Sequence, residues 1–275
     1  VVLAVDSDFV ALTTHKKNYP QAQHMNLKLP STELLPIPDG NTPWHLHGSP
    51  PCTSISLLNQ LRIPDDRSNA VKIVDWFIRY AISSTATTWS MEQVATPLVL
   101  NCMRKCKKEF RQDEFDYGVF NFCRLGVPQN RRRLIAGSPE IVARLRRAPL
   151  VRRSVSNVIK RPRGTHIRNS KTQSQLGPGV VVNGKRKISY TPKTDNDYCW
   201  PITGPSYCVL ASYPLRWATP NSAKKVKLCC LNVDETMRLQ CFPPDYKLPR
   251  RKADCIRGIG NALPPTIMQQ MLTLT

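Results

Sequence analysis

The chain has 275 residues, and its 40 Lys and Arg outnumber its 19 Asp and Glu, which gives a formal net charge of +21. Such an excess of positive charge is typical of proteins that bind a polyanion. We find no apolar run of about 18 residues and no signal-peptide pattern, so we expect no membrane span.

A strand and a helix are the first predicted elements. Residues 1–5 are apolar and mostly β-branched and end at Asp6, and residues 8–18 then read as a helix. An acidic residue at the carboxyl end of a strand in a Rossmann-like sheet can accept hydrogen bonds from the ribose hydroxyls of an adenosyl cofactor.

A cysteine on a stiff loop comes next. Residues 44–47 are strand-like and lead into Gly-Ser-Pro-Pro-Cys-Thr-Ser-Ile-Ser at 48–56. The two prolines fix φ and push the residues before them out of the helical region, so we expect Cys52 on a rigid loop rather than in a core. A thiol attacks only as the thiolate, and this placement favours a nucleophile over a packing residue.

Further motifs alternate with predicted helices. An amphipathic helix is expected over residues 69–82 and a basic helix over 98–111, with Ser-Met-Glu-Gln-Val at 90–94 between them. Gly-Val-Pro-Gln-Asn-Arg-Arg-Arg at 126–133 then runs into a strand at 134–137. Two last motifs precede a closing helix at 266–272, namely Arg-Leu-Gln-Cys-Phe-Pro at 238–243 and Gly-Ile-Gly-Asn-Ala-Leu-Pro-Pro at 258–265.

Together, in this order, these motifs resemble those of the DNA cytosine-5 methyltransferases: Pro-Cys, Glu-Asn-Val, Gln-x-Arg-x-Arg, Arg-x-Gln-x-Phe-Pro and Gly-Asn-Ala-Val-Pro-Pro. The resemblance runs from residue 1 to about 270, apart from a variable middle. It implies an α/β fold, with the Rossmann-like sheet of S-adenosylmethionine-dependent methyltransferases, helices on both faces and a small target-recognition lobe. We place the catalytic and cofactor-binding domain at 1–139 and 231–275, and the target-recognition domain at 140–230.

The resemblance makes Cys52, Glu92, Arg131 and Arg133 the catalytic residues. The Cys52 thiolate would add to C6 of a cytosine, which makes C5 enamine-like and able to accept a methyl group from a sulfonium donor. Glu92 would contact N3 and the exocyclic amine, which requires a carboxyl that can hold a proton in a closed, water-poor pocket. Arg131 and Arg133, two apart on a strand, are expected on one face, where they reach the ring O2 and the phosphates.

The same resemblance implies S-adenosylmethionine as the cofactor and double-stranded DNA as the partner. The residues assigned to the cofactor are Asp6 (ribose), Asn26 and Leu27 (adenine), Pro51 and Val71 (pocket wall) and Asn261 (methionine end). The residues assigned to DNA are Ser56, Arg67, Gln129, Arg186, Lys187 and Thr203. Segment 140–230 fits this partner, because it holds eighteen Lys or Arg against three acids.

Three departures from the family pattern are visible. Thr53 stands where the family usually has Gln, and Gln93 stands where it usually has Asn, which lengthens the amide by one methylene. The Phe-x-Gly-x-Gly turn with which the family begins is absent. We therefore expect the sheet to lack its central strand, and an N-terminal segment or a second chain to supply the turn.

The ten cysteines form no Cys-x-x-Cys pair and no histidine stands at zinc-finger spacing, so we expect no metal. Cys102 and Cys106, four apart on the basic helix, leave a metal or a disulfide open. A reactive thiol fits an intracellular compartment: the nucleus of a eukaryote, or the cytoplasm or nucleoid of a bacterium or virus.

Two alternatives remain beside a DNA enzyme. One is a tRNA cytosine-5 methyltransferase, against which the Thr-Ser-Ile sequence at 53–55 and the large basic segment argue. The other is a truncated, inactive DNA-binding relic. The intact Cys52, Glu92, Arg131 and Arg133 argue against decay, whereas the missing glycine turn argues for it.

Overall fold

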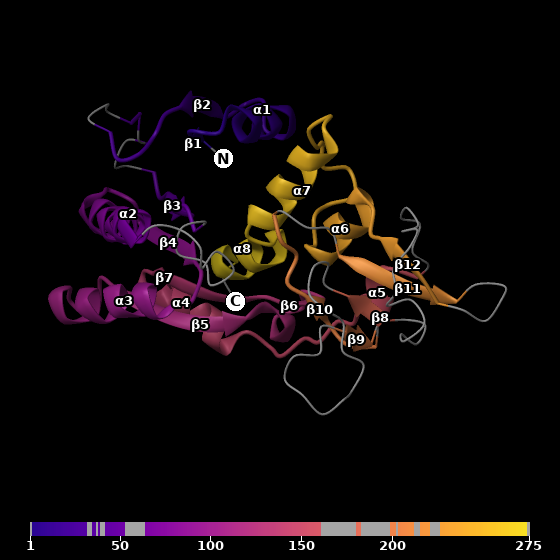
Figure 1. Cartoon of the computed structure of the whole chain (residues 1–275). Coiled ribbons are helices and arrows are strands. Elements are labelled where there is room, and N and C mark those ends of the chain that lie inside the picture. Colours follow the sequence, from indigo (N-terminus) through magenta and orange to yellow (C-terminus); the bar gives the residue numbers. More distant parts are fainter. Residues whose placement is uncertain are drawn as a thin grey trace. The chain divides into compact units, whose positions relative to one another are not determined.

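The computed structural model describes residues 2–31, 35–36, 38, 42–52, 64–160, 180–182, 199–201, 203–211, 215–220 and 226–273. The chain divides into two compact units (Figure 1). Unit 1 comprises Val1–Asn121, Arg132–Ala148 and Gln269–Thr275, and unit 2 comprises Phe122–Arg131 and Pro149–Met268. Its bounds differ from those of the predicted domains: residues 122–131 and 231–268 belong to unit 2, and residues 140–148 belong to unit 1.

Unit 1 begins with a β-α-β segment. Strands β1 (Leu3–Asp6) and β2 (Gln23–Asn26) pair in parallel, with Asp6 opposite Asn26, and helix α1 (Phe9–Asn18) connects them. The Asp8 carboxylate caps α1 by accepting hydrogen bonds from the N–H groups of Val10 and Ala11, at 2.9 and 3.3 Å. The predicted strand and helix are confirmed here.

A four-stranded mixed sheet forms the centre of unit 1. Its order is β3 (His45–Gly48), β4 (Thr88–Gln93), β7 (Arg132–Gly137) and β5 (Asp116–Asn121). Strands β3 and β4 are parallel, whereas β7 runs antiparallel to both β4 and β5.

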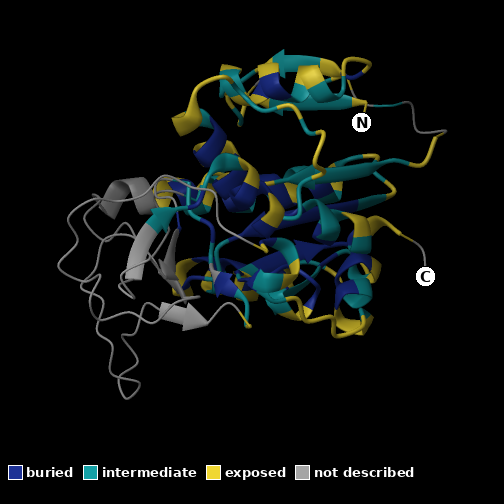
Figure 2. Ribbon diagram, turned by 90° about the vertical axis from the view of Figure 1, so that its right-hand side faces the viewer, coloured by how far each residue is buried: buried dark blue, intermediate teal, exposed yellow. Residues whose placement is uncertain are grey.

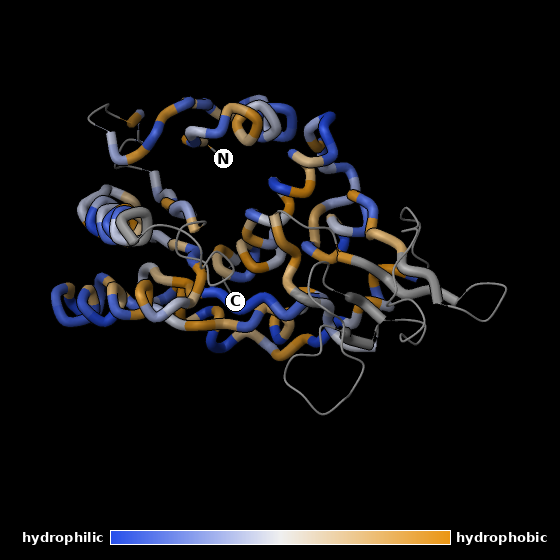
Figure 3. Tube along the Cα trace, in the orientation of Figure 1, coloured by the Kyte–Doolittle hydropathy of each residue, from blue (hydrophilic) through white to orange (hydrophobic). Residues whose placement is uncertain are grey.

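Helices lie on both faces of this sheet. Alternate residues of β4, Trp89 and Met91, pack into a core with α2 (Pro64–Ser83) and α3 (Pro97–Glu109). The other residues of β4 point to the opposite face, and α4 (Pro139–Arg147) packs on β5 and β7. Figure 2 shows this core in dark blue, and in Figure 3 α2 and α3 alternate between hydrophilic and hydrophobic residues, as expected of helices that cover a sheet.

Both long helices were predicted at nearly these positions. The structure starts α2 five residues earlier than its apolar periodicity, at Pro64, which is favoured at the first position of a helix because its missing N–H is not needed there. Among the described residues, no helix combines the length and the hydropathy that crossing a bilayer requires.

Unit 2 is built on short elements. Strand β6 (Gln129–Asn130) pairs in parallel with β10 (Ser206–Tyr207). A separate antiparallel sheet has the order β12 (Val226–Cys230), β11 (Arg216–Pro220), β8 (Val180–Val182) and β9 (Cys199–Pro201). The helical segments are η2 (Phe122–Arg124), α5 (Val155–Val158), α6 (Val233–Leu239), α7 (Lys252–Asn261) and the first half of α8 (Pro265–Leu272).

A second apolar core holds unit 2 together. Leu231, Met237, Leu239 and Ile259 are among its buried members. At the start of α6, Asn232 and Glu235 form a reciprocal capping box, with hydrogen bonds of 2.7 and 2.8 Å to each other's backbone N–H.

Candidate active site

The loop that carries Cys52 begins at the carboxyl end of β3. Gly48, the last residue of β3, lies opposite Met91 of β4. Since the carboxyl ends of parallel strands meet at one edge of a sheet, the loop from Ser49 to Cys52 leaves the sheet at the end of β4 that carries Glu92 and Gln93. Cys52 is half-buried and Pro51 is exposed, so the thiol lies on a loop, as the prolines predict.

Gln93 ties this loop to β4. Its Nε2 donates a hydrogen bond to the carbonyl oxygen of Pro50 at 3.0 Å, and its Oε1 accepts one from the N–H of Val94 at 2.8 Å. The side chain has no exposed surface. The sequence identified Gln93 only as a departure from the family pattern, whereas the structure makes it the tether of the Cys52 loop.

Glu92 and Arg133 form an ion pair on adjacent strands. Strands β4 and β7 are antiparallel with Glu92 opposite Ile135, so Arg133 is its diagonal neighbour. Arg133 Nε lies 2.8 Å from Glu92 Oε1, and the two side chains are only 15% and 7% exposed. Water therefore screens this pair little, and each charge depends on the other.

A chain of polar side chains lies on the same face of the sheet as Glu92. His45 Nδ1 lies 2.7 Å from Thr88 Oγ1 and its Nε2 lies 2.8 Å from Ser90 Oγ. His47 Nδ1 lies 2.8 Å from the same Ser90 oxygen, and its Nε2 lies 3.3 Å from Ser49 Oγ. The chain thus runs along β3 and β4 to the first residue of the Cys52 loop.

Both histidines of this chain are held neutral. Burial, and secondly the charge of Arg144 on α4, lowers the pKa of His45 to about 4. Burial, and secondly His45, lowers the pKa of His47 to about 3. A neutral imidazole offers one donor and one acceptor, which suits a chain of alternating hydroxyls and rings. The His-Leu-His alternation at 45–47 is the sequence signal that could have revealed this network.

The expected nucleotide residues of β1 and β2 lie together. The carbonyl oxygen of Asp6 accepts hydrogen bonds from Asn26 Nδ2 at 3.0 Å and from the N–H of Leu27 at 3.1 Å. The exposed Asp6 carboxylate accepts the N–H of Asp8 at 2.8 Å, beside the start of α1. Val71 packs on the core and lines a groove between α2 and α3, and its place in a cofactor pocket stays a prediction.

Arg131 belongs to unit 2 and is engaged by the backbone. It is 1% exposed. Its Nη1 donates to the carbonyl of Val209 at 3.2 Å, and its Nη2 donates to the carbonyls of Gly260 and Ala262 at 3.1 and 3.0 Å. A guanidinium presents several N–H groups in a fixed fork, which allows one side chain to join chain segments far apart in sequence.

Gln129 is equally internal. Its side chain is fully buried, its Nε2 donates to the carbonyl of Leu239 at 2.9 Å and to Gln240 Oε1, and its Oε1 accepts the N–H of Val209 at 2.8 Å. Gln240 in turn donates to the carbonyl of Ala262 at 2.6 Å. Three of the predicted motifs therefore interlock inside unit 2.

These contacts correct two expectations. The structure ends β6 at Asn130 and begins β7 at Arg132, so Arg131 and Arg133 do not share the face of one strand. The Arg131 guanidinium donates to three backbone carbonyls, and its catalytic role stays a prediction. Gln129 does not present its amide to DNA, because the amide is fully buried and bound within the protein.

The remaining predicted site residues are exposed or lie outside the described residues. Asn261, the last residue of α7, and Thr203, in a turn, are both exposed. Arg67 lies in α2, but its side chain is outside the described residues, as are Ser56, Arg186 and Lys187 altogether.

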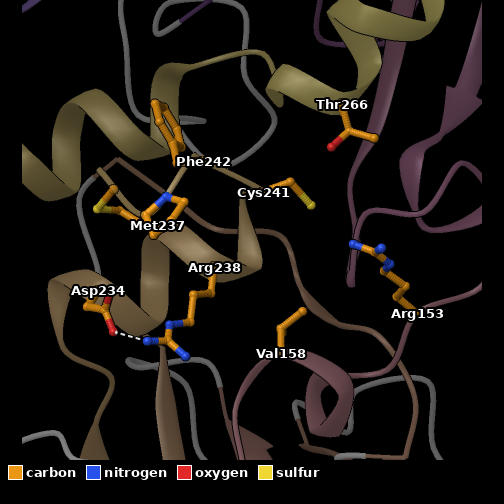
Figure 4. Close-up of a pocket in the computed structure, with 9 residues that line it drawn as sticks. Arg153, Val158, Asp234, Met237, Arg238, Cys241, Phe242 and Thr266 are labelled. Carbon is orange, nitrogen blue, oxygen red and sulfur yellow. Dashed lines mark ion pairs between the residues drawn. The ribbon is translucent and has the colours of Figure 1, made fainter. Parts of the chain in front are cut away.

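Unit 2 also contains a pocket of about 450 Å³ beside α6 (Figure 4). Arg153, Phe242, Thr266 and Cys241 are among its lining residues, and Arg238 at its edge pairs with Asp234 at 3.0 Å. Cys241 has a φ of 59°, in the left-handed region, and burial raises the pKa of its thiol. The pocket contains none of the residues predicted for catalysis.

Comparison with known proteins finds a family match in the second half of the chain. Residues 151–273 match the model of the C-5 cytosine-specific DNA methylase family. The search of curated proteins gave no match.

Solved structures resemble the chain over almost its whole length. A protein described as a DNA modification methyltransferase of an E. coli prophage is 16% identical, with 99% of this chain and 90% of that chain covered and a TM-score of 0.62. S. pombe Dnmt2 methyltransferase is 12% identical, with coverage of 99% and 89% and a TM-score of 0.58. A Spodoptera frugiperda DNMT2 variant is 16% identical, with coverage of 99% and 91% and a TM-score of 0.55.

At these identities the structural likeness shows the fold alone. The expected resemblance is thus confirmed for residues 151–273, which match the C-5 cytosine-specific DNA methylase model, and the chain as a whole has the α/β fold of these solved methyltransferase structures.

Proposed function

We propose that this chain is a DNA (cytosine-5-)-methyltransferase that transfers a methyl group from S-adenosylmethionine to C5 of a cytosine flipped out of the duplex. The observation that carries the proposal is the sheet edge at which the Cys52 loop, tethered through Gln93, lies beside the Glu92–Arg133 ion pair. C5 is inaccessible to a thiol within a stacked duplex, so the base must leave the stack.

The residues of unit 1 have distinct roles in this chemistry. The Cys52 thiolate forms a bond to C6, and the electron pair of the C5–C6 bond becomes available at C5 for the methyl group. Glu92 holds N3 and the exocyclic amine, which favours the charge that the addition places on the ring. Loss of the C5 proton to a base then expels the Cys52 thiolate and restores the aromatic ring.

Arg133 positions Glu92 and can itself contact the flipped cytosine. The ion pair fixes the orientation of the Glu92 carboxylate, and the guanidinium beside it has the charge to bind the ring O2. Gln93 keeps the Cys52 loop at the same edge by holding the carbonyl of Pro50. The reacting atoms must be placed within a few tenths of an ångström. The Arg133 ion pair and the Gln93 hydrogen bond therefore both affect the rate of methyl transfer.

The residues of β1 and β2 fit an adenosyl cofactor. S-adenosylmethionine would supply the methyl group on a sulfonium centre. The Asp6 carboxylate is exposed, with one backbone N–H on it among the described contacts, and suits a ribose diol, while Asn26 and Leu27 beside it suit an adenine edge. Pro51, Val71 and Asn261 remain assigned to the cofactor by resemblance alone.

Double-stranded DNA is the proposed partner because of charge. The chain carries +21 overall, and eighteen of its basic residues, Arg186 and Lys187 included, fall in residues 140–230. Basic residues that neutralise phosphates contribute most of the sequence-independent affinity for DNA. Arg67, Ser56 and Thr203 are further proposed DNA contacts.

A transfer assay with a radiolabelled methyl group tests the proposal. The 275-residue chain, with and without an added segment carrying a Phe-x-Gly-x-Gly turn, is incubated with duplex DNA or with tRNA. Label in cytosine C5 of DNA supports the proposal, and label only in tRNA identifies the alternative RNA substrate. DNA binding without transfer in either preparation would identify an inactive DNA-binding relic.

A further inference from the structure

Helices α2 and α3 bring together three side chains that can ligate a metal ion. Asp75 lies on α2, and Cys102 and Cys106 lie on α3. One ligand atom from each lies within 4.8 Å of the other two, and Cys106 Sγ is 3.8 Å from Asp75 Oδ1. This cluster belongs to unit 1 and shares no residue with the Cys52–Glu92 edge.

The helix geometry explains the cluster. Residues four apart on an α-helix lie one above the other on the same face, so both sulfurs point from α3 toward α2. Cys102 is 6% exposed and Cys106 is 1% exposed, and both belong to the core that these helices form with the sheet. The two cysteines are therefore held by packing, and Asp75 meets them across the helix pair.

We propose that Asp75, Cys102 and Cys106 bind a zinc ion. Thiolate sulfur and carboxylate oxygen bind Zn²⁺ at about 2.3 Å and about 2.0–2.2 Å, so two tetrahedral ligands lie roughly 3.5–3.8 Å apart. The 3.8 Å between Cys106 Sγ and Asp75 Oδ1 is already at that spacing. Two sulfur ligands favour zinc over the hard cations magnesium and calcium.

Arg79 prepares the carboxylate for this role. Its Nε lies 2.8 Å from Asp75 Oδ2, and its two terminal nitrogens lie 2.6 and 2.8 Å from the oxygens of Glu109. A weaker contact of 3.4 Å joins Arg79 Nη2 to Oδ1, the oxygen nearest Cys106. Arg79 thus turns Oδ1 toward the thiols while it holds Oδ2, as outer hydrogen-bonding partners do at metal sites.

The surroundings supply the fourth ligand and balance the charge. Asp75 and Cys102 line a groove of about 830 Å³ between α2 and α3, from which a water molecule can complete a tetrahedron. Two thiolates, one carboxylate and Zn²⁺ carry a net charge of −1. Lys72, Arg79 and Lys105 on the same groove compensate for this negative charge.

The ion would join α2 to α3. Because the ligands come from two helices, binding free energy is realised only when the helices are packed, and it adds to the stability of the folded state. The spacing of Cys102 and Cys106 left a metal or a disulfide open, but it could not indicate the third ligand, Asp75, which lies on another helix.

Titration of the reduced, metal-free 275-residue chain with Cd²⁺ and Co²⁺ tests the proposal. Thiolate ligation produces a charge-transfer absorption band, and its intensity reports the number of sulfur ligands. We expect a two-thiolate band in the native chain. The Cys102→Ser and Cys106→Ser variants should each lose about half of it, and Asp75→Asn should keep the band with at least tenfold weaker affinity. Cys255→Ser, which changes a buried cysteine of unit 2, is the matched control and should behave as the native chain.

Thermal unfolding gives a second readout that does not depend on absorption. Zn²⁺ should raise the Tm of the native chain and of Cys255→Ser, and should not raise that of Cys102→Ser. A native chain without the band, or a band unchanged in both Cys102→Ser and Cys106→Ser, overturns the proposal. If the serine variants fail to fold, as judged by circular dichroism, an unchanged affinity in Asp75→Asn overturns it.

Discussion

Arg133 on β7 holds Glu92 on β4 through an ion pair of 2.8 Å between Nε and Oε1, in a setting that admits little water. The pair joins two motifs that lie far apart in the sequence and places both charges at the edge from which the Cys52 loop departs. Removing one partner leaves the other as a nearly buried, uncompensated charge.

Replacing Arg133 with Ala should therefore lower both turnover and stability. We expect kcat to fall by about 10²–10³, as for loss of one charge-stabilising donor, and the free energy of unfolding to fall by about 3 kcal/mol. DNA affinity should stay within a few-fold. The exposed neighbour Arg132→Ala is the control. The double variant Glu92→Gln/Arg133→Ala should be more stable than Arg133→Ala alone, but it should stay inactive. If the stability losses of the two single variants simply add in the double variant, the two side chains are not coupled.

Replacing Cys52 with Ala should abolish methyl transfer and leave DNA binding within a few-fold, because the thiol serves the chemistry and not the affinity. DNA that contains 5-fluorocytosine should form a denaturation-resistant adduct with the native chain, since fluorine at C5 prevents the final elimination. Gel electrophoresis under denaturing conditions measures the adduct, with Cys123→Ala as the control. An active enzyme that forms no adduct would rule out the covalent mechanism.

Shortening or removing the Gln93 amide should loosen the Cys52 loop. Gln93→Ala loses the hydrogen bond to the Pro50 carbonyl and should reduce kcat by about tenfold or more through misplacement of the thiol, with little change in DNA affinity. Gln93→Asn keeps the amide but is one methylene shorter, so an intermediate rate is expected. Alkylation of Cys52 followed by mass spectrometry should be faster in Gln93→Ala; equal alkylation rates would show that the tether does not restrain the loop.

Changing Arg131 should act on stability before activity. Arg131→Lys keeps the charge but cannot reach the carbonyls of Val209, Gly260 and Ala262 together. Each buried carbonyl left without a donor costs about 1–3 kcal/mol, so a clear drop in Tm is expected. Denaturant unfolding measures the loss. A variant with native stability and strongly reduced kcat would instead give Arg131 the catalytic role expected from the sequence.

Acidification should destabilise the protein before its carboxylates titrate. The folded pKa values of His45 and His47, about 4 and about 3, lie below the ordinary value of 6.5, so the unfolded chain binds more protons between these values. Stability is therefore fully present above pH 6.5 and is lost as pH falls through 6.5 toward the folded values.

The loss between pH 7.5 and pH 5 should be about 2 kcal/mol for each histidine and so about 4 kcal/mol for the pair, since one pKa unit corresponds to about 1.4 kcal/mol. Thermal unfolding followed by circular dichroism measures it. The double variant His45→Gln/His47→Gln should lose most of this pH dependence. A native chain whose Tm is unchanged over this range would mean that the two rings gain protons in the folded state.

Local pattern was enough to predict the elements but not the contacts between them. The apolar periodicity of residues 69–82 and 98–111 predicted α2 and α3, and the two prolines before Cys52 predicted its loop. The burial of Arg131 was not predictable, because it depends on three carbonyls from distant segments that converge only in the folded chain. Arg131 and Arg133 are two apart in sequence, and this spacing predicted that they share one face of a strand.

The division into units escaped prediction for a similar reason. A single run of basic residues suggested a lobe that begins and ends with that run, whereas the folded units exchange segments several times. The contact between the Gln93 amide and Pro50 was also not predictable from the sequence, because it depends on the pairing of β3 with β4.

The exchange of segments constrains the order in which the protein can mature on the ribosome. Residues 269–275 belong to the same unit as residues 1–121, and within it Arg144 Nη1 donates a hydrogen bond of 2.8 Å to the carbonyl of Met271. All of residues 149–268 must be synthesised before this contact can form. Unit 1, which carries Cys52 and Glu92, is therefore translated early, but its fold should be complete only after translation has passed residue 271.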